Sequence, residues 1–277
     1  MESNQTDRPG DALPTAPLAG DALADSLSED LARAEQQEVG HVPTGVEGAG
    51  DLEEERVKDE IDIQIDLLND PDWVVRREAV ITLGEMGDER CVAPLAKALR
   101  DGDWQVREVA VEAMGQVGSP AVETLLKLLR DWEVRKYAIL SLGKIRDERV
   151  LAPLMLQLRN DEFKDDAIMA LVELGEPAIP LLIAALRDKD EQVRKSAVLA
   201  LGRIKNDQAI APLIEMLEDK DWFTRLTAAA ALESIGDERG RHAITPLLKD
   251  PDMVVRMRVE RILAKWKKQS VSQPATA

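Results

Sequence analysis

Apolar side chains recur through Asp188–Leu217 with the spacing of two helices joined by a turn. In the first part, steps of four, four and three residues place four of them on one helical face: Val193, Ala197, Leu201 and Ile204. The polar run at 205–208 interrupts this pattern, and a second apolar series then begins. This stretch therefore predicts one helix, a turn and a second helix.

Copies of this unit follow one another along the chain at a nearly constant period. Aligned on Ala197, the equivalent positions are Ala79, Ala110, Ala138, Ala167, Ala228 and Val259. Successive gaps are 31, 28, 29, 30, 31 and 31 residues. Such a period with helix-turn-helix content predicts an all-α, right-handed α-solenoid of about seven two-helix repeats. We call the helix with the aligned alanine the inner helix of its repeat, and its partner the outer helix.

The composition supports an array of helices in which no repeat folds alone. Hydrophobic residues make up 44% of the chain and aromatic residues 3%, and no stretch alternates apolar and polar positions as a half-buried strand does. Roughly six buried side chains per repeat would contribute about 1.5–3 kcal/mol each. Ordering about thirty residues costs roughly 1–2 kcal/mol per residue. Each repeat therefore needs its neighbours in order to fold.

The array is expected at residues 58–268, between two segments of different composition. Residues 1–57 are rich in Pro, Gly, Ala, Ser and acidic residues, which predicts a disordered acidic tail. Leucines at steps of four within 21–37 predict a short helix, either transient or folding against a partner or the array. Residues 269–277 are predicted to form a disordered C-terminal tail.

Capping and turn residues mark the helix ends within the array. Glycine and proline lie between the expected helices, where glycine closes one helix and proline opens the next. Aspartates stand just before the inner helices, where a carboxylate accepts free backbone N–H groups: Asp72, Asp103, Asp131, Asp190 and Asp221. The helix pairs are expected at 61–86, 89–116, 121–145, 148–174, 177–204, 207–235 and 241–266.

A cation lies three residues before each aligned position: Arg76, Arg107, Arg135, Lys164, Arg194, Arg225 and Arg256. Because every repeat shares this charge, we predict that each cation meets an aspartate of a turn in its own or a neighbouring repeat. Tryptophans lie six residues before the alanine in four repeats: Trp73, Trp104, Trp132 and Trp222. We expect them to cover the joints between repeats, and an aromatic ladder for a ligand is the alternative.

Charge, cysteine content and targeting signals exclude several functional classes. The net charge of -17 argues against general nucleic-acid binding, which needs a basic face. The single cysteine, Cys91, excludes an internal disulfide framework and is expected to be a core thiol. No secretory signal is visible, and the longest apolar run, at 178–186, is too short to span a bilayer. These features predict a soluble, cytoplasmic protein.

The motif D-x-x-V-R-x-x-A-x-x-x-L-G-x-I, followed eight residues later by P-L, describes Asp190–Leu213. Asp72–Leu95 matches it with Met86 in place of Ile. These residues resemble the HEAT-like repeat named after the phycobilisome (phycocyanobilin) lyases, and the resemblance extends over about 70–267. That family includes bilin lyase subunits, di-iron deoxyhypusine hydroxylases and many proteins that only bind other proteins. The resemblance implies that the inner helices line the concave surface.

The residues themselves bear on the hydroxylase activity. In that branch of the family, iron ligands come from His-Glu pairs directly after the V-R step. The equivalent places here lack histidine: Arg77–Glu78, Glu108–Val109, Lys136–Tyr137, Asp165–Asp166, Lys195–Ser196 and Leu226–Thr227. We therefore predict no metal site, no catalytic residue and no cofactor. A bilin lyase-type auxiliary subunit stays open, because in those systems the reactive cysteine lies on the acceptor protein.

Function is expected where the repeats differ, on the outward strip of the inner helices. Helical geometry turns the places two before, two after and six after the aligned alanine outward. The predicted partner-binding residues are Arg77, Ile81, Glu85, Glu108, Glu112, Lys136, Tyr137, Leu140, Lys144, Met169, Lys195, Leu199, Arg203 and Leu226. Apolar groups among mixed charges are typical of a protein-binding surface. The alternative is that the apolar members pack against neighbouring inner helices.

Together these patterns predict a non-catalytic interaction module or scaffold whose partner is another protein. No nucleic acid, membrane or small-molecule substrate is expected. The cations between Arg256 and Lys268 suit the end of the last inner helix and a polar terminal repeat. A site for an acidic partner is the alternative there.

Overall fold

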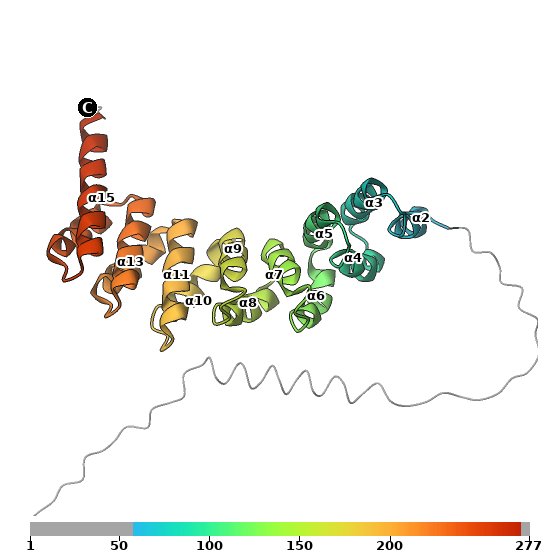
Figure 1. The fold of residues 1–277 in the computed structure, drawn as a ribbon, viewed down its shortest axis with the longest axis horizontal. Helices are drawn as coiled ribbons and strands as arrows, with labels where there is room; N and C mark the ends of the chain where they lie inside the picture. Colours follow the sequence, from blue (N-terminus) through green and yellow to red (C-terminus); the bar gives the residue numbers. More distant parts are fainter. Residues whose placement is uncertain (1–57, 273–277) are drawn as a thin grey trace, which may run out of the picture. The chain divides into compact units, whose positions relative to one another are not determined.

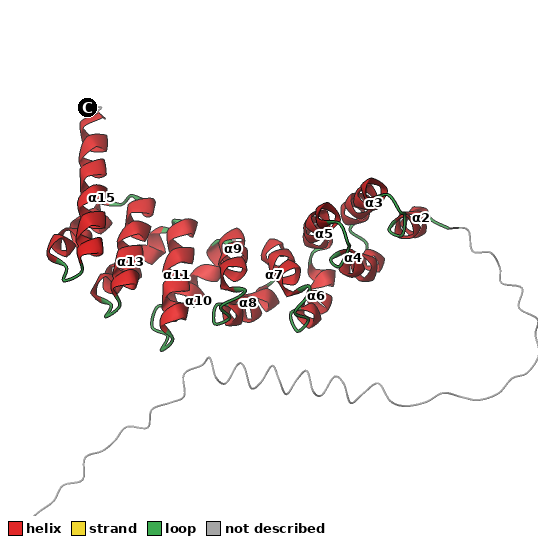
Figure 2. Ribbon diagram, in the orientation of Figure 1, coloured by secondary structure: helices red, strands yellow, loops and turns green. Residues whose placement is uncertain are grey.

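The computed structural model describes the backbone of residues 58–272 and the side chains of residues 58–267. The predicted acidic tail at 1–57, with its short helix at 21–37, lies outside the described residues, as do residues 273–277. Within the described part, helices and the turns between them account for the chain, and no strand is present (Figure 2). The prediction of an all-α fold is confirmed.

Outer and inner helices alternate from α2 to α15 (Figure 1). The outer helices are α2 (Glu60–Leu67), α4 (Val92–Ala98), α6 (Val122–Leu128), α8 (Leu151–Gln157), α10 (Ile179–Ala185), α12 (Ile210–Glu215) and α14 (Glu238–Ile244). The inner helices are α3 (Trp73–Met86), α5 (Trp104–Val117), α7 (Arg135–Lys144), α9 (Lys164–Leu174), α11 (Glu191–Ile204), α13 (Trp222–Ile235) and α15 (Met253–Ser272). This order confirms the predicted two-helix repeats, and α15 continues past residue 268 to Ser272.

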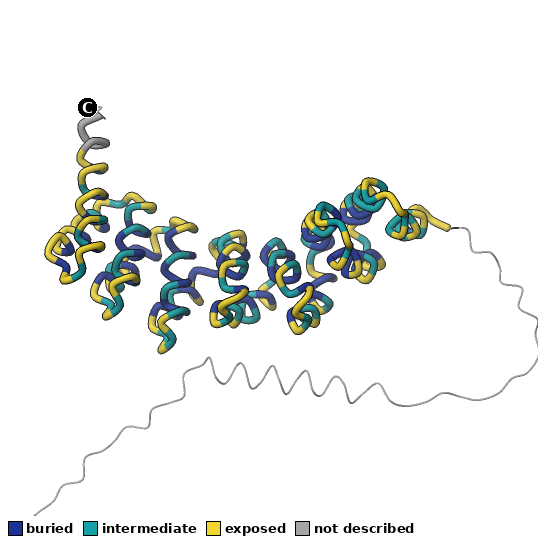
Figure 3. Tube along the Cα trace, viewed as in Figure 1, coloured by how far each residue is buried: buried dark blue, intermediate teal, exposed yellow. Residues whose placement is uncertain are grey.

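The inner helices pack side by side in chain order, and the outer helices lie against one side of this row. Buried positions lie mainly where helices of the two rows and neighbouring inner helices face one another (Figure 3). The six aligned alanines all lie in this core, and none is more than 1% exposed. The alignment of the repeats on these alanines is therefore also their alignment in space.

A glycine five residues after the aligned alanine brings successive inner helices into close contact. A Cβ atom added to Gly143 would lie 2.7 Å from the Cβ atom of Ala170 in α9. A Cβ atom added to Gly202 would lie 2.6 Å from that of Ala231 in α13. Since α9 carries Val172 at the equivalent place, its contact with α11 is looser. The glycines thus set the spacing of the row.

Six arginines form hydrogen bonds to the backbone of the turn between the outer and the inner helix of their repeats. Each guanidinium donates to the backbone carbonyls six and five residues before it: Arg76, Arg107, Arg135, Arg194, Arg225 and Arg256. These carbonyls follow the end of the outer helix, where no helical N–H is available to them. The recurring cation therefore has a structural role in each of these repeats.

Three of these arginines also bind an aspartate of the next repeat, an interaction that we call the aspartate clamp. The pairs are Arg76–Asp101, Arg194–Asp219 and Arg225–Asp250. In the first, Nε and Nη2 of Arg76 each lie 2.7 Å from a carboxylate oxygen of Asp101. The hydrogen bonds from the arginine lower the pKa of Asp101 and, in the third pair, of Asp250. The predicted contact with a neighbouring aspartate is confirmed for these three arginines.

The same prediction is wrong for Arg107 and Arg135, in the middle of the array. Nε of Arg107 lies 2.8 Å from Oη of Tyr137, to which it donates. The guanidinium of Arg135 lies over the ring of Phe163, 5.2 Å from its centroid. In the turn that follows Arg107, Asp131 binds Arg100 instead, and the turn that follows Arg135 carries the amide of Asn160 at the clamp position.

Lys164 and Arg256 differ from the clamp arginines for other reasons. Nζ of Lys164 lies 2.8 Å from a carboxylate oxygen of Asp161 in its own turn, which confirms the predicted pairing there. Arg256 bonds only to the carbonyls of its own turn, because no further repeat follows it in the described residues. The prediction of an aspartate partner is wrong for Arg256.

The predicted helix caps are confirmed in four repeats. Asp72, Asp103, Asp190 and Asp221 each accept a backbone N–H of the first turn of an inner helix. Asp131 is the exception, since it accepts the N–H of Glu133 at 3.0 Å in a turn and α7 begins only at Arg135. As a result α7 has 10 residues, against 14 in α3 and α5.

Three of the four tryptophans do not cover the joints between repeats, so that expectation is wrong for them. Trp104, Trp132 and Trp222 are 61%, 68% and 42% exposed. Trp104 and Trp222 are the first residues of their helices, as Trp73 is of α3, so this position alone does not decide whether the ring is covered. Trp73 alone packs partly against the core.

The close approach at Gly143 predicts that Gly143→Ala destabilises the array. The added methyl group would force α7 and α9 apart, and overpacking of this kind costs about 1–3 kcal/mol. Urea unfolding followed by circular dichroism measures the change. Gly102→Ala is the control, because a Cβ atom there meets no atom within 4 Å. An equal loss of stability in the two variants would contradict the steric account.

The aspartate clamps predict a specific loss of stability in acid. Because the folded protein lowers the pKa of Asp250, the ionised clamp stabilises the fold fully above the ordinary aspartate pKa of about 3.9. This contribution is lost as the pH falls through the lower folded value. Asp250→Asn should therefore lower the unfolding temperature at pH 7, and its deficit relative to wild type should shrink below about pH 4.

Thermal unfolding of both proteins between pH 7 and pH 2 tests this expectation. Asp207→Asn, in an exposed turn, is the matched control and should unfold near the wild-type temperature at every pH. A deficit of Asp250→Asn that stays constant down to pH 2 would refute the clamp as its cause.

Candidate functional site

A groove of about 410 Å³ crosses the inner-helix surface over α5, α7 and α9. We call it the central groove. Its lining residues are Trp104, Glu108, Val111, Glu112, Lys136, Tyr137, Leu140, Lys144, Met169, Ala170 and Glu173. It lies in the part of the array where the repeats are shortest and the aspartate clamp is missing. The shortest repeats therefore coincide with a groove on the inner-helix surface.

The groove has an apolar base and two exposed apolar side chains beside it. Val111 and Ala170 are buried, and Leu140 packs partly against the core. Trp104 and Met169 are 61% and 54% exposed. Exposed apolar groups of this size, next to a depression, are typical of binding surfaces.

Tyr137 is held in place from the side of α5. Its hydroxyl accepts the hydrogen bond from Nε of Arg107 at 2.8 Å, and the guanidinium carbon of Arg107 lies 5.6 Å from the ring centroid. Arg107 is in turn fixed to the carbonyls of its own turn. The missing clamp aspartate thus allows an aromatic side chain to be positioned within the groove.

Some charged residues of the groove form ion pairs within it, and others do not. Nζ of Lys144 lies 2.8 Å from a carboxylate oxygen of Glu112. Lys136 lies close enough to Asp166 on α9 to affect its titration. Glu108 and Glu173 have no ion-pair partner among residues 58–267. The groove therefore has an excess of negative charge that is not neutralised from within.

Ionisation of Asp166 is unfavourable in the folded chain. Burial raises the pKa of this carboxyl above its ordinary value, Lys136 opposes the rise, and the charge of Asp165 adds to it. The two carboxylates are adjacent in α9, and Asp165 is exposed. An ionised Asp166 is therefore less favourable in the folded chain than in the unfolded chain.

Seven of the predicted partner-binding residues line the central groove. They are Glu108, Glu112, Lys136, Tyr137, Leu140, Lys144 and Met169. The structure thus brings together residues from three successive inner helices, at the outward places that the helical spacing indicates. Their role in binding a partner stays a prediction.

The other seven predicted residues lie outside the groove. Arg77, Ile81 and Glu85 are on α3, Lys195, Leu199 and Arg203 are on α11, and Leu226 is on α13. Leu199 and Leu226 pack partly against the core, as the alternative interpretation of the apolar residues anticipated. Nζ of Lys195 forms ion pairs with Glu191 and, at 3.3 Å, with a carboxylate oxygen of Asp221.

Four lining residues were not among the predicted ones: Trp104, Val111, Ala170 and Glu173. Glu173 lies six residues after its aligned alanine, a place already predicted to face outward in three other repeats, so the spacing alone could have identified it. Trp104 was assigned to a repeat joint. Val111 and Ala170 are buried, and only the structure shows that they form the base of the groove.

No cluster that could hold a metal ion exists in the described part of the chain. His242 is exposed, and its Nδ1 lies 2.8 Å from the carbonyl oxygen of Glu238. Cys91 is buried, as predicted, and burial raises the pKa of its thiol.

Among residues 58–272 no single helix is long and apolar enough to cross a membrane. Helix α9 and the following segment to Ala185 reach that length and apolar character together, but across a bend of 117°.

A family model for HEAT repeats matches the chain in overlapping segments at 61–131, 92–172, 155–233 and 179–264. No sequence among curated proteins matches the chain. Among solved structures, human deoxyhypusine hydroxylase in complex with glycerol is 23% identical, covers 75% of this chain and 84% of its own, and has a TM-score of 0.38.

Two further solved structures show the range of proteins with similar repeats. The complex of CpcE and CpcF of phycocyanin lyase from Nostoc is 22% identical, with coverages of 80% and 100% and a TM-score of 0.38. A designed armadillo repeat protein in complex with peptide (KR)4 is 22% identical, with coverages of 75% and 100% and a TM-score of 0.32. These TM-scores are too low to carry an argument about activity.

The raised pKa of Asp166 predicts that Asp166→Asn stabilises the protein at neutral pH. The cost of the buried charge is fully present above the raised folded pKa and disappears below the unfolded value of about 3.9. Thermal unfolding should therefore show a higher midpoint for the variant at pH 7 and equal midpoints near pH 3. Asp165→Asn is the control. A variant less stable than wild type at pH 7 would show that Lys136 outweighs burial.

Proposed function

The chain belongs to the HEAT-repeat family, and we propose that it is a non-catalytic scaffold that binds another protein through its inner-helix surface, with the central groove at the centre of the contact. One observation carries the proposal. Exposed Trp104 and Met169 stand beside an apolar base, next to carboxylates that have no partner within the described chain. Aromatic and methionine side chains are enriched at protein interfaces, where they supply most of the buried apolar area.

The groove favours a partner segment of a particular composition. An apolar side chain of the partner would fill the space between Trp104 and Met169 and exclude water from the base. Lysine or arginine residues on either side of it would meet Glu108 and Glu173. Such rim charges contribute more to the rate and selectivity of association than to affinity.

The contact would extend beyond the groove. A specific protein interface involves about 20–30 residues on each partner, which is more than the eleven residues that line the groove. The remaining predicted residues provide the neighbouring surface, with Arg77, Ile81 and Glu85 on α3 and Arg203 on α11.

Site-specific photocrosslinking tests this proposal. A photoreactive amino acid replaces Met169 in the groove or Met257 on α15, two methionines of similar exposure at 54% and 50%. Both proteins are irradiated in native extract, and the crosslinked proteins are identified. We expect one stoichiometric partner to crosslink at position 169 and to be absent at position 257.

Charge reversal then tests the composition of the partner segment. Glu108→Lys with Glu173→Lys should lower the association rate constant of the identified partner at least about tenfold, because two attractive rim charges become repulsive. Glu133→Lys, in the exposed turn before α7, is the matched control and should bind as wild type does. The same proteins crosslinking at both positions, or equal binding by all variants, would refute the proposed surface.

A further inference from the structure

The aspartate clamp is missing at the turns that precede α7 and α9, where Arg107 bonds to Tyr137 and Arg135 lies over the ring of Phe163. In a regular clamp, Nε and Nη2 of the arginine bind the carboxylate 25 residues further on, as Arg76 binds Asp101. The residue 25 positions after Arg135 is Asn160, which carries an amide instead. Within residues 58–267, no carboxylate binds Arg135. This arginine therefore keeps its place in the repeat without its usual anionic partner.

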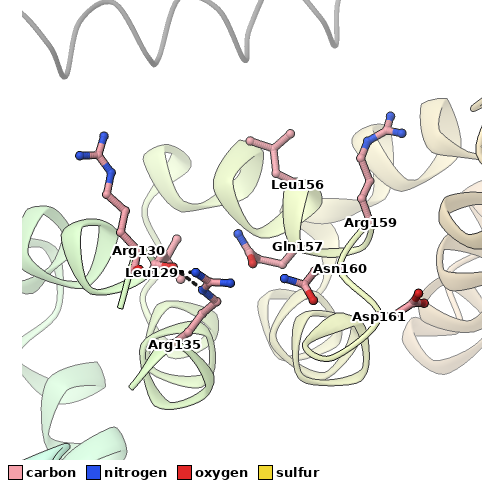
Figure 4. A pocket seen from close by; sticks show the side chains of 8 residues that line it. All are labelled: Leu129, Arg130, Arg135, Leu156, Gln157, Arg159, Asn160 and Asp161. Carbon is pink, nitrogen blue, oxygen red and sulfur yellow. Dashed lines mark hydrogen bonds between the residues drawn. The ribbon is translucent and has the colours of Figure 1, made fainter. Parts of the chain in front are cut away.

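The guanidinium of Arg135 is also turned relative to the clamp arginines. The clamp arginines donate from Nη1 to the two carbonyls of their own turn. Arg135 uses Nε and Nη2 for its turn carbonyls, so its Nη1 has no hydrogen-bond partner in the described part of the chain. Figure 4 shows the guanidinium facing the side chains of Gln157 and Asn160. Strong, unused N–H donors thus point toward two amides.

An open surface depression of about 690 Å³ lies at this place (Figure 4). Its lining residues are Leu129, Arg130, Arg135, Leu156, Gln157, Arg159, Asn160 and Asp161. The carboxylate of Asp161 is bound to Lys164 at 2.8 Å, and Arg159 is paired with Asp188 and Asp190. Arg130 and Arg135 have no ion-pair partner in the described residues, so the depression has an excess of positive charge, although the whole chain has a net charge of -17. We call it the arginine cavity.

The amide side chains add donors to the arginine cavity. Oδ1 of Asn160 accepts the backbone N–H of Glu162 at 3.0 Å, which leaves its Nδ2 group to donate elsewhere. The side-chain amide of Gln157 has no hydrogen-bond partner in the described residues. Arg130 is exposed and without an ion pair there, whereas Arg159 is bound to Asp188 at 2.6 Å. Planar guanidinium and amide donors around one space match the several lone pairs of an oxyanion.

We propose that the arginine cavity binds an oxyanion, a carboxylate or phosphate group carried by a ligand, in the place of the missing clamp aspartate. Arg135 would be its principal contact, with the side-chain amides of Gln157 and Asn160 beside it (Figure 4). The cavity shares no residue with the central groove, so this is a second binding function that does not depend on the proposed partner surface.

Two probes test the proposal on the full-length chain at low ionic strength, where exposed charges are least screened. A labelled tetraglutamate peptide is titrated by fluorescence anisotropy, and inorganic phosphate is titrated by calorimetry. Wild type is expected to bind at least one of them. Binding of phosphate identifies a phosphate-bearing ligand, and binding of the peptide alone identifies a carboxylate-bearing one.

Two variants remove the site by different means. Arg135→Gln should bind about tenfold more weakly, because the charge-assisted hydrogen bonds are lost. Asn160→Asp keeps the acceptor for the N–H of Glu162 and places a carboxylate in the cavity, so it should weaken binding by about the same factor. If circular dichroism shows that Arg135→Gln does not fold, Asn160→Asp decides the question.

Arg187→Gln is the matched control. Arg187 is an exposed arginine after the end of α10, bound to Glu215 at 3.0 Å, and its removal changes the net charge by the same amount. This variant should bind within about twofold of wild type. Binding of neither probe by wild type, or equal affinities for all folded variants, would overturn the proposal.

Discussion

The bond from an arginine of the inner helix to the turn before it is the constraint on which the rest of the array depends. The carbonyls at the end of an outer helix need donors, and one planar guanidinium can satisfy two of them and still reach a carboxylate in the next repeat. A lysine offers one point charge, and Lys164 accordingly binds a single side chain of its own turn. Where the next turn supplies no carboxylate to it, as at Arg135, the same arginine keeps an unused N–H donor.

The regular part of the fold could be predicted from the sequence because it depends on spacing that every repeat shares. The buried alanines, the aspartate caps and the helix pairs all follow from an apolar period and from residues next to each other in the chain. The contacts that Arg107 and Arg135 make in place of the clamp could not be predicted in this way. The gaps of 28 and 29 residues show that the turns are short, but they do not show that Tyr137 and Phe163 take over the contact.

The candidate site shows the same division. Helical spacing identified the outward places on each inner helix, and half of the predicted residues line one groove. It treats every repeat alike, however, and cannot show that a groove forms over α5, α7 and α9. Trp104 was missed for a related reason, since a tryptophan at the start of a helix can face a neighbouring helix or the solvent, and the sequence pattern is the same in both cases.

The positions of the aspartate clamps have a consequence for how the repeats are joined. One clamp joins the first two repeats and two join the last three, while none links α5 to α7, α7 to α9, or α9 to α11. The middle repeats are joined by other bonds instead, which include Arg100 with Asp131, Arg107 with Tyr137 and Arg159 with Asp188. The array thus has one kind of joint at its two ends and another in the middle, where both the central groove and the arginine cavity lie.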